Sequence, residues 1–330
     1  MKYRKLGRTG IQVSEIGFGA WGIGGWGLRD DAESLRALNR AIDLGYTFFD
    51  TAMGYGDGHS ERLIGQVVTG KRDKVVIASK ISPKTMRWPV LPHEPIKDTF
   101  SKEWVISCTE NSLKNLKTDY LDVQQLHAWT PEYVHESEWY EGLLKLKEQG
   151  KVRAFGVSAN DWDPYGTVSL VESGLIDSIQ VIYNIFEQRP EERLLPAALK
   201  HQVGIIVRVP FEEGLLTGAL RPGYIFPEGD WRANWLTPER LAEADRRVQA
   251  LTSFLNDNTP SLATLALKFC LSHPAVSTVI PGIRTVKHAE ANALASDGIP
   301  LAAEVVSQLK AHKFIHGWSY PWAQKAPGNS

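Results

Sequence analysis

The stretch DAESLRALNRAIDLGYTFFD, residues 31–50, joins one helix directly to one strand. Its apolar residues first recur at intervals of three and four, which predicts an amphipathic helix over 31–44 with Asp30 or Asp31 as its N-cap. Gly45 ends that helix, and residues 46–50 then form a short strand that is largely apolar on both faces. Such strands are typical of parallel sheets covered by helices. The stretch therefore indicates an α/β protein.

The same alternation of strand and helix continues along the whole chain. Further strands are expected at 15–19, 75–80, 120–127, 154–158, 178–183, 204–209 and 278–281. Further helices are expected from residue 60, at 96–116 and 136–149, between 159 and 173, up to about 200, and at 238–255, 261–272, 285–296 and 302–312. The strands are too far apart for hairpins and should be parallel. Eight such units predict a (β/α)8 TIM barrel with an N-terminal β-hairpin at 3–13 and long βα loops at 81–95 and 219–236.

Length and composition exclude several other classes of protein. The 330 residues suit a single barrel domain, 1–330, with an irregular tail from about 313, and 43% hydrophobic residues exclude a disordered chain. Lys and Arg number 37 against 38 Asp and Glu with no basic stripe, so no nucleic-acid partner is expected. Apolar runs are too short for a membrane span or a signal peptide. Two isolated cysteines, Cys108 and Cys270, favour a reducing, cytoplasmic location. Oligomeric state is not predictable.

Residues 17–22, GFGAWG, match the G-x-G-x-x-G pattern of dinucleotide-binding folds. In those folds a helix opens at once from the glycines, so that its N-terminus meets the pyrophosphate. Here more glycines follow, and the first helix begins well after them. A turn after the first strand is therefore the better interpretation.

Polar side chains stand where the predicted strands end. Asp50, Lys80 and His127 each end a strand, and Tyr55 lies in the loop just after Asp50. The carboxyl ends of barrel strands converge on one face, so these four should meet. Tyrosine is a proton donor whose pKa a nearby ammonium lowers, a carboxylate holds that ammonium, and histidine can donate to a carbonyl oxygen. This is the equipment for protonating an alkoxide that forms by hydride addition.

With these features the sequence resembles the aldo-keto reductase superfamily over nearly its whole length. The motifs that carry the resemblance are KLGRTG at 5–10, GFGAW at 17–21, GYTFFDTA at 45–52, Tyr55-Gly56, SERLIG at 60–65, Lys80, Leu126-His127 and GLLTG at 214–218, the last typical of bacterial-type members. The resemblance implies NADP(H)-dependent reduction of an aldehyde or ketone, or the reverse oxidation of an alcohol. In it, Tyr55 is the general acid, Lys80 lowers its pKa, Asp50 anchors Lys80, and His127 orients the carbonyl.

The resemblance also implies a cofactor site. Ser158 and Gln180 match carboxamide contacts, whereas Ala159 is inserted before Asn160. Arg208 stands where many members have a stacking Tyr, and it either stacks on the nicotinamide or pairs with an acid such as Glu212. Arg284 at the start of a helix suits a 2′-phosphate, and so favours NADP(H). The full set expected at the cofactor is Trp21, Asp50, Ser158, Asn160, Gln180, Arg208, Pro210, Phe211, Gly214, Leu216, Gly218, Gly282, Arg284, His288 and Asn292.

Tryptophans in the βα loops predict an aromatic wall for the substrate pocket. The chain has 11 Trp, and those expected at the pocket are Trp21, Trp26, Trp88, Trp129 and Trp235, with Trp318, Tyr320 and Trp322 in the tail as further candidates. Such a wall favours bulky or apolar carbonyl compounds, or a sugar stacked on a ring, over small charged molecules.

Three alternatives stay open. Lys80 could form a Schiff base, as in barrel aldolases. The chain could be a non-catalytic NADP-binding subunit that senses redox state on the same fold. His312 and His316 have the spacing of a metal pair, but no third ligand is apparent, so no metal is expected.

Overall fold

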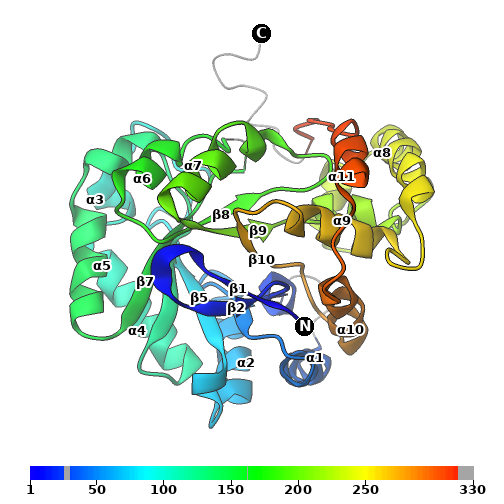
Figure 1. Ribbon diagram of the computed structural model, residues 1–330. Helices are drawn as coiled ribbons and strands as arrows, with labels where there is room; N and C mark the ends of the chain where they lie inside the picture. Colours follow the sequence, from blue (N-terminus) through cyan, green and yellow to red (C-terminus); the bar gives the residue numbers. More distant parts are fainter. Residues whose placement is uncertain (26–29, 162, 319–330) are drawn as a thin grey trace.

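The computed structural model describes residues 1–25, 30–161 and 163–318. Eight parallel strands form one sheet in sequence order, and helices surround it (Figure 1). The first and last strands meet through parallel bridges, Ile16 with Val279 and Gly19 with Gly282, which close the sheet. This confirms the predicted (β/α)8 barrel.

The strands of the barrel are short and almost wholly buried. They are β3 (Phe18–Gly19), β4 (Phe48–Asp50), β5 (Val76–Ile81), β6 (Leu121–Leu126), β7 (Val152–Ser158), β8 (Ser178–Ile182), β9 (Gly204–Arg208) and β10 (Val276–Val279). The first strand is shorter than the predicted 15–19, and only the bridge at Ile16 extends its pairing. All eight expected strand positions are otherwise occupied.

The helices follow the expected order with three differences. They are α1 (Asp31–Asp43), α2 (His59–Val68), α3 (Ile96–Thr99), α4 (Lys102–Leu116), α5 (Glu138–Glu148), α6 (Val168–Ser173), α7 (Leu194–His201), α8 (Pro238–Ala250), α9 (Leu262–Leu271), α10 (Val286–Ala293) and α11 (Ala303–Lys310). The helix predicted at 96–116 is two helices, because Phe100 leaves the helical conformation and the Ser101 hydroxyl caps α4 at the Trp104 N–H. Helices α6 and α7 begin later than expected, so longer loops follow β7 and β8.

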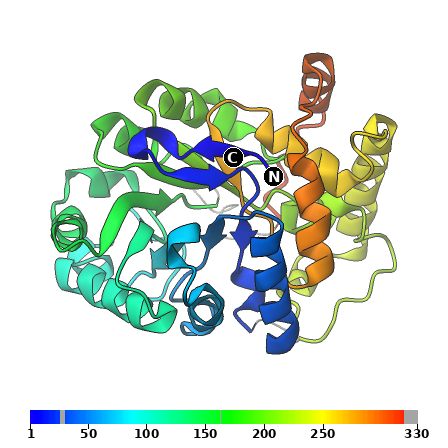
Figure 2. The ribbon, with the colours of Figure 1, turned by 60° about the horizontal axis from the view of Figure 1, so that its bottom comes forward.

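Helix α1 begins as its sequence predicts. The Asp30 carboxylate accepts a hydrogen bond from the Glu33 backbone N–H at 2.9 Å, which caps the helix. Ala37, Leu38 and Ala41 form its buried face. Helix α1 lies beside α10 in both ribbon views (Figures 1 and 2), so the first and last βα units of the barrel are neighbours.

An antiparallel hairpin closes the amino-terminal end of the barrel. Strands β1 (Tyr3–Lys5) and β2 (Gln12–Ser14) pair with each other and cross the barrel (Figure 2). Gly7, with φ of 50°, touches the start of β9, and a Cβ there would lie 2.4 Å from the Gly204 nitrogen. The hairpin shares one apolar cluster with inward-facing strand residues, namely Leu6, Ile11, Val13, Phe48, Val76, Ala78, Val123, Ala154, Ile206 and Ile280. Only the carboxyl end of the barrel is therefore left for a site.

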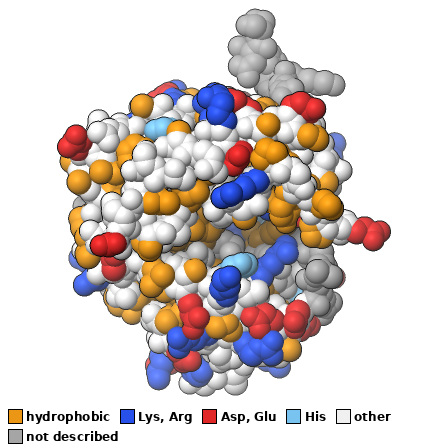
Figure 3. Space-filling model, turned by 90° about the vertical axis from the view of Figure 1, so that its right-hand side faces the viewer, with side chains coloured by type: hydrophobic (Ala, Val, Ile, Leu, Met, Phe, Trp, Pro, Cys, Tyr) orange, Lys and Arg blue, Asp and Glu red, His pale blue; other side chains and the backbone are white. Residues whose placement is uncertain are grey.

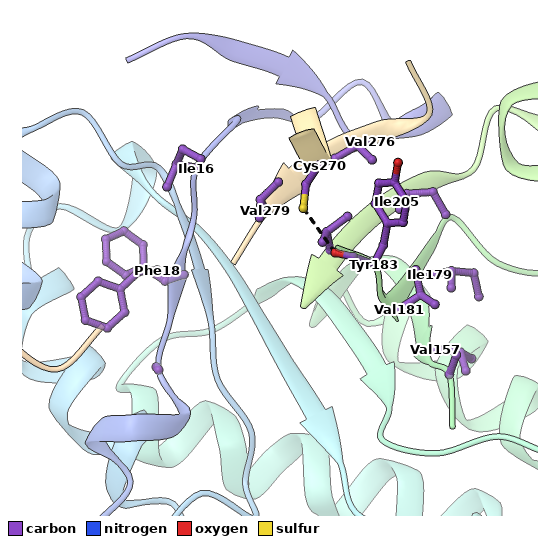
Figure 4. Packing of buried hydrophobic residues seen from close by; sticks show 14 of the residues in the cluster. Ile16, Phe18, Val157, Ile179, Val181, Tyr183, Ile205, Cys270, Val276 and Val279 are labelled. Carbon is purple, nitrogen blue, oxygen red and sulfur yellow. Dashed lines mark hydrogen bonds between the residues drawn. The ribbon is translucent and has the colours of Figure 1, made fainter. Parts of the chain in front are cut away.

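The larger core lies between the strands and the helices. Figure 4 shows side chains of β7, β8 and β9 beside Tyr183 and Cys270 of α9. The Cys270 thiol donates to the Tyr183 carbonyl at 3.3 Å.

Cys108 and Cys270 are both buried free thiols, and burial raises the pKa of Cys108 to about 12. Neither cysteine forms a disulfide.

Within the described residues, no helix has both the length and the apolar character needed to cross a membrane.

We expect Leu6→Ala to lower the free energy of unfolding by about 3 kcal/mol, because it leaves a cavity in the closed end of the barrel. Leu6 is fully buried, whereas Leu199 is 52% exposed and provides the control Leu199→Ala. Urea unfolding followed by circular dichroism measures both. Equal losses of unfolding free energy in the two variants would contradict the conclusion that the hairpin packs into the amino-terminal end of the barrel.

Candidate active site

Three of the four predicted catalytic side chains form one hydrogen-bonded cluster around Lys80. Asp50 ends β4, and Lys80 lies two residues beyond its register partner on β5, Ala78. The Lys80 Nζ donates to Asp50 Oδ1 at 2.5 Å, to the Thr51 carbonyl at 2.9 Å and to Tyr55 Oη at 3.1 Å. An ammonium has three N–H donors, so all are used. Since Lys80 is fully buried and Asp50 is 2% exposed, the ion pair is almost completely desolvated.

Two glutamines hold the other oxygen of Asp50. Gln180 Nε2 donates to Asp50 Oδ2 at 2.7 Å, and Gln125 Nε2 donates to the same oxygen at 3.3 Å. Gln125 is the strand partner of Lys80, and Gly156 leaves space for it, since a Cβ there would lie 2.9 Å from its Cγ. Gln125 was not predicted from the sequence, although two polar residues in a buried strand signalled it. Gln180, expected at the cofactor, binds Asp50 in this structure.

His127 lies beside the tyrosine at the mouth of the barrel. Its ring centroid is 5.7 Å from that of Tyr55 and 5.7 Å from that of Trp88. Burial, together with the charges of Lys80 and Arg208, holds the pKa of His127 well below its usual value. Its Nδ1 is buried and has no hydrogen-bond partner in the described part of the chain. The ring is therefore neutral and has one N–H to donate.

Tyr55 is held in place by a tight turn, and its phenol stays protonated. Gly56 has φ of 63°, and a Cβ there would lie 1.7 Å from the Gly24 carbonyl oxygen, so only glycine fits. Burial raises the pKa of Tyr55, and the nearby Lys80 charge lowers it by less. The net direction differs from the expected lowering, because the low polarity around the ring outweighs one ammonium that Asp50 already neutralises. A protonated phenol is the form that a proton donor needs.

The expected carboxamide contacts lie together at the ends of β7 and β8. Ser158 is the register partner of Gln180 and is 3% exposed. Asn160 instead donates from Nδ2 to the Trp129 carbonyl at 2.7 Å and so joins two βα loops. Because Ala159 separates it from Ser158, Asn160 lies on the loop and not at the strand end.

Arg208 at the end of β9 pairs with an acid other than the one expected. Its Nη2 donates to the Ala159 carbonyl at 2.9 Å and forms an ion pair with the Asp161 carboxylate. Glu212 instead accepts from Asn184 Nδ2 at 2.6 Å and lies 3.2 Å from His316 Nε2. Arg208 is thus paired with the acid Asp161, and its stacking on the nicotinamide stays a prediction.

The segment after β9 has an unusual backbone. Val209, Glu212, Glu213 and Gly214 all have positive φ, with 101° at Gly214. The chain turns sharply here, and the N–H groups of Glu212 and Gly214 donate to the carbonyls of Val209 and Phe211 in the same segment. Arg232 Nη1 donates to the Glu213 carbonyl at 3.0 Å and ties the long loop at 219–236 to this segment. The other positions expected here, Pro210, Phe211, Leu216 and Gly218, lie in or beside the same segment, where Leu216 is 1% exposed.

The last group of expected cofactor residues lies at the start of α10. Arg284 is exposed and packs on Gly22, where a Cβ would lie 2.8 Å from its Cγ. Arg284 and Thr285 line a hollow together with residues that precede and begin α1. Gly282 faces open space, His288 is exposed on α10, and Asn292 is 5% exposed. Figure 3 shows a hollowed face of the molecule, with basic and histidine side chains in the hollow and hydrophobic side chains around it.

Comparison with known proteins identifies the family of this chain. The family model for the aldo/keto reductase family matches residues 15–313. The chain belongs to the aldo/keto reductase family.

Individual relatives of the family cover nearly the same span. An aldo-keto reductase of Bacillus subtilis (strain 168), YhdN, is 33% identical over 299 residues, which are 88% of this chain and 87% of that relative. A probable voltage-gated potassium channel subunit beta of Arabidopsis thaliana is 31% identical over 327 residues, 93% of this chain and 94% of that relative.

Solved structures of the family are also similar. The holo form of aldo-keto reductase AKR11C1 from Bacillus halodurans has a TM-score of 0.75 and 28% identity over 95% of this chain and 96% of that one. An aldo/keto reductase from Klebsiella pneumoniae in complex with NADP and acetate has a TM-score of 0.70 and 27% identity over 94% of this chain and 95% of that one. As a family member, this chain is an oxidoreductase of carbonyl groups, and the family uses NADP(H).

The tryptophans expected at the substrate pocket of this aldo-keto reductase divide into an exposed and a buried set. Trp21 is 37% exposed and Trp88 is 42% exposed. Trp129 is 2% exposed and packs edge-on against Trp139, with centroids 5.2 Å apart. Trp235 is 5% exposed and packs on Trp231. Both rings are thus buried among other aromatic side chains, and their place in the substrate pocket stays a prediction. Trp26, Tyr320 and Trp322 lie outside the described residues, and Trp318 stacks on His316.

The two histidines with metal-pair spacing contact different partners. His312 packs on the ring of Phe254, whereas His316 lies against Glu212. Within residues 1–25, 30–161 and 163–318, no group of three or more His, Cys, Asp or Glu side chains could hold a metal ion.

We expect Asp50→Asn to lower the free energy of unfolding by about 3 kcal/mol, because it leaves the buried Lys80 ammonium without a counter-charge. The double variant Asp50→Asn/Lys80→Met removes that charge and should recover part of the loss. Urea unfolding measures both. If the double variant is no more stable than Asp50→Asn alone, the unpaired charge is not the cause.

Proposed function

We propose that this chain reduces an aldehyde or ketone with hydride from NADPH, with Tyr55 as the general acid. The observation that carries the proposal is the distance of 3.1 Å between Tyr55 Oη and Lys80 Nζ, within a pair that Asp50 neutralises. Tyr55 and His127 are only partly buried, so a substrate carbonyl can reach both.

Each side chain of the cluster has one task in the proposed reaction. The bound cofactor would supply the hydride to the carbonyl carbon. The neutral His127 N–H donates to the carbonyl oxygen and so fixes its position. Tyr55 then gives its proton to the alkoxide that forms, and Lys80 stabilises the resulting phenolate. Asp50, held by Gln125 and Gln180, keeps Lys80 charged and in place.

Several features of the barrel mouth fit a dinucleotide phosphate. Gly282 has open space where a Cβ would stand, so a phosphate could approach the backbone closely there. Arg284 beside the α10 N-terminus suits the 2′-phosphate. Ser158 and Gln180 would hold the carboxamide, while Arg208, fixed by Asp161, would lie against the nicotinamide side of the site. His288 and Asn292 on α10 would then face the adenosine.

The substrate that fits best is a bulky or apolar carbonyl compound. The exposed rings of Trp21 and Trp88 lie in the βα loops after β3 and β5, and Trp88 also touches His127. Aromatic faces bury apolar groups and stack on sugar rings. We assign this activity to one barrel domain spanning the chain.

One observation favours a second candidate function. The channel-subunit relative from Arabidopsis thaliana covers 93% of this chain. A non-catalytic NADP-binding subunit that senses redox state would keep the cofactor site but show no turnover. Loss of NADPH absorbance with a panel of aromatic and short-chain aldehydes and ketones separates the two, since only a reductase consumes NADPH.

We expect Tyr55→Phe to reduce carbonyl turnover at least about a thousandfold, since general acid catalysis contributes roughly 10²–10⁴-fold. NADPH binding, followed by fluorescence titration, should stay unchanged within about twofold. Turnover close to that of the wild type would contradict the role of Tyr55.

We expect Arg284→Ala to raise the dissociation constant for NADPH about tenfold or more, since a charge-assisted hydrogen bond is worth roughly 1.5–3 kcal/mol. NADH lacks the 2′-phosphate, so its dissociation constant should change far less. Isothermal titration calorimetry with both cofactors tests this. Equal effects on NADPH and NADH would refute the phosphate role of Arg284.

A further inference from the structure

Glu33 of α1 reaches across to the first residue of α10. Its Oε1 accepts a hydrogen bond from the Val286 N–H at 2.8 Å, and its Oε2 accepts one from Arg36 Nε at 2.9 Å. The Thr285 hydroxyl caps the next turn by accepting from the His288 N–H at 3.2 Å. A carboxylate of this chain thus occupies a backbone donor at the same helix start to which Arg284 belongs.

Acids and bases meet at this point, where Arg36 and Lys287 add positive charge beside Arg284. Arg284 lines its hollow with three acids, Asp30, Asp31 and Glu33. Asp30 caps α1, and Asp31 lies 2.8 Å from the His59 ring nitrogen, so both point to other partners. Glu33 is the acid whose hydrogen bond reaches the first residue of α10. The hydrogen bond from Val286, followed by that from Arg36, lowers the pKa of Glu33, so this carboxylate is ionised at neutral pH.

We propose that Glu33 is a specificity-determining residue that weakens selection of NADPH over NADH. The inference rests on the proposed cofactor site at Arg284. A 2′-phosphate beside Arg284 must either displace the Glu33 carboxylate from the Val286 N–H or stand next to its negative charge. Both cost binding free energy, because like charges repel and the helix N-terminus offers few free donors.

The same carboxylate suits the 2′-hydroxyl of NADH. In doubly wound dinucleotide-binding folds an acidic side chain binds the ribose 2′-hydroxyl of NAD, whereas an arginine accommodates the 2′-phosphate of NADP, and the same chemistry applies to the hollow here. This chain places one of each on opposite sides of one hollow, on α1 and just before α10. Glu33 and Arg284 therefore act in opposite directions on the choice of cofactor.

The test compares Glu33→Gln with a matched control on the same helix. Asp43→Asn removes the same charge from the other end of α1, where the side chain is exposed. Isothermal titration calorimetry of the apoprotein gives dissociation constants for NADPH and NADH. Glu33→Gln should tighten NADPH roughly five- to tenfold, the upper range for one charge at a helix N-terminus. NADH should change by less than about twofold, because the glutamine oxygen can still accept a hydrogen bond from the 2′-hydroxyl. Asp43→Asn should move neither.

The outcomes separate this inference from the proposed cofactor site. If Arg284→Ala weakens NADPH selectively but Glu33→Gln leaves the ratio of the two constants unchanged, Glu33 has no role in selection and the site stands. If neither variant changes the ratio, both proposals fail.

The thermal midpoint of apo Glu33→Gln should lie near that of the wild type. If it does not, Glu33→Asp, which keeps the charge on a shorter side chain, should shift NADPH binding less than Glu33→Gln, and an equal shift would overturn the proposal.

A crystal structure with NADP gives a direct second readout. We expect the Glu33 carboxylate to have left the Val286 N–H, with the phosphate in its place beside Arg284. A carboxylate still bonded to Val286 beside an undisturbed phosphate would overturn the proposal.

Discussion

The buried ion pair between Lys80 and Asp50 constrains the rest of this structure. Two charges removed from water cost several kcal/mol each unless every donor and acceptor is satisfied. The barrel meets that demand with the Thr51 carbonyl, the Tyr55 hydroxyl and two glutamine amides, drawn from β6, β8 and the loop after β4. The ion pair and its partners therefore bring together five chain segments, namely β4, the loop after it, β5, β6 and β8. The position of the tyrosine follows from this arrangement.

This constraint explains why the two ends of the barrel differ. At the amino end many inward side chains of the strands are apolar, and the hairpin packs on them with Leu6, Ile11 and Val13. At the carboxyl end the inward positions of Asp50, Lys80, Gln125 and Gln180 are polar, and Tyr55 and His127 lie beside them. Burial then acts on both rings. It keeps the phenol protonated and the imidazole neutral, which are the forms that donate hydrogen bonds.

The fold could be predicted because most strands and helices have local sequence patterns that are typical of them. The order of eight strands, the hairpin and most helix boundaries follow from apolar spacing and caps, and the meeting of Asp50, Tyr55 and Lys80 follows from barrel topology alone. What could not be predicted depends on contacts between distant loops. Trp129 is buried because α5 and its Trp139 pack on it, and Arg208 meets Asp161 because Ala159 lengthens the loop after β7. No local pattern records such pairings, and the roles of these residues in catalysis or cofactor binding remain predictions.

The contact between Glu33 and Val286 belongs to the same kind of long-range feature, yet it has a simple structural origin. A closed barrel makes its first and last units neighbours, so the start of α1 lies beside the start of α10. Both helices direct their N-termini toward the carboxyl end of the strands, where a phosphate would bind. Acids favoured in the first turn of α1 are therefore brought next to the anion site at the start of α10. In a barrel of this kind, the residues that stabilise the first helix also set the charge that a cofactor meets at the last one.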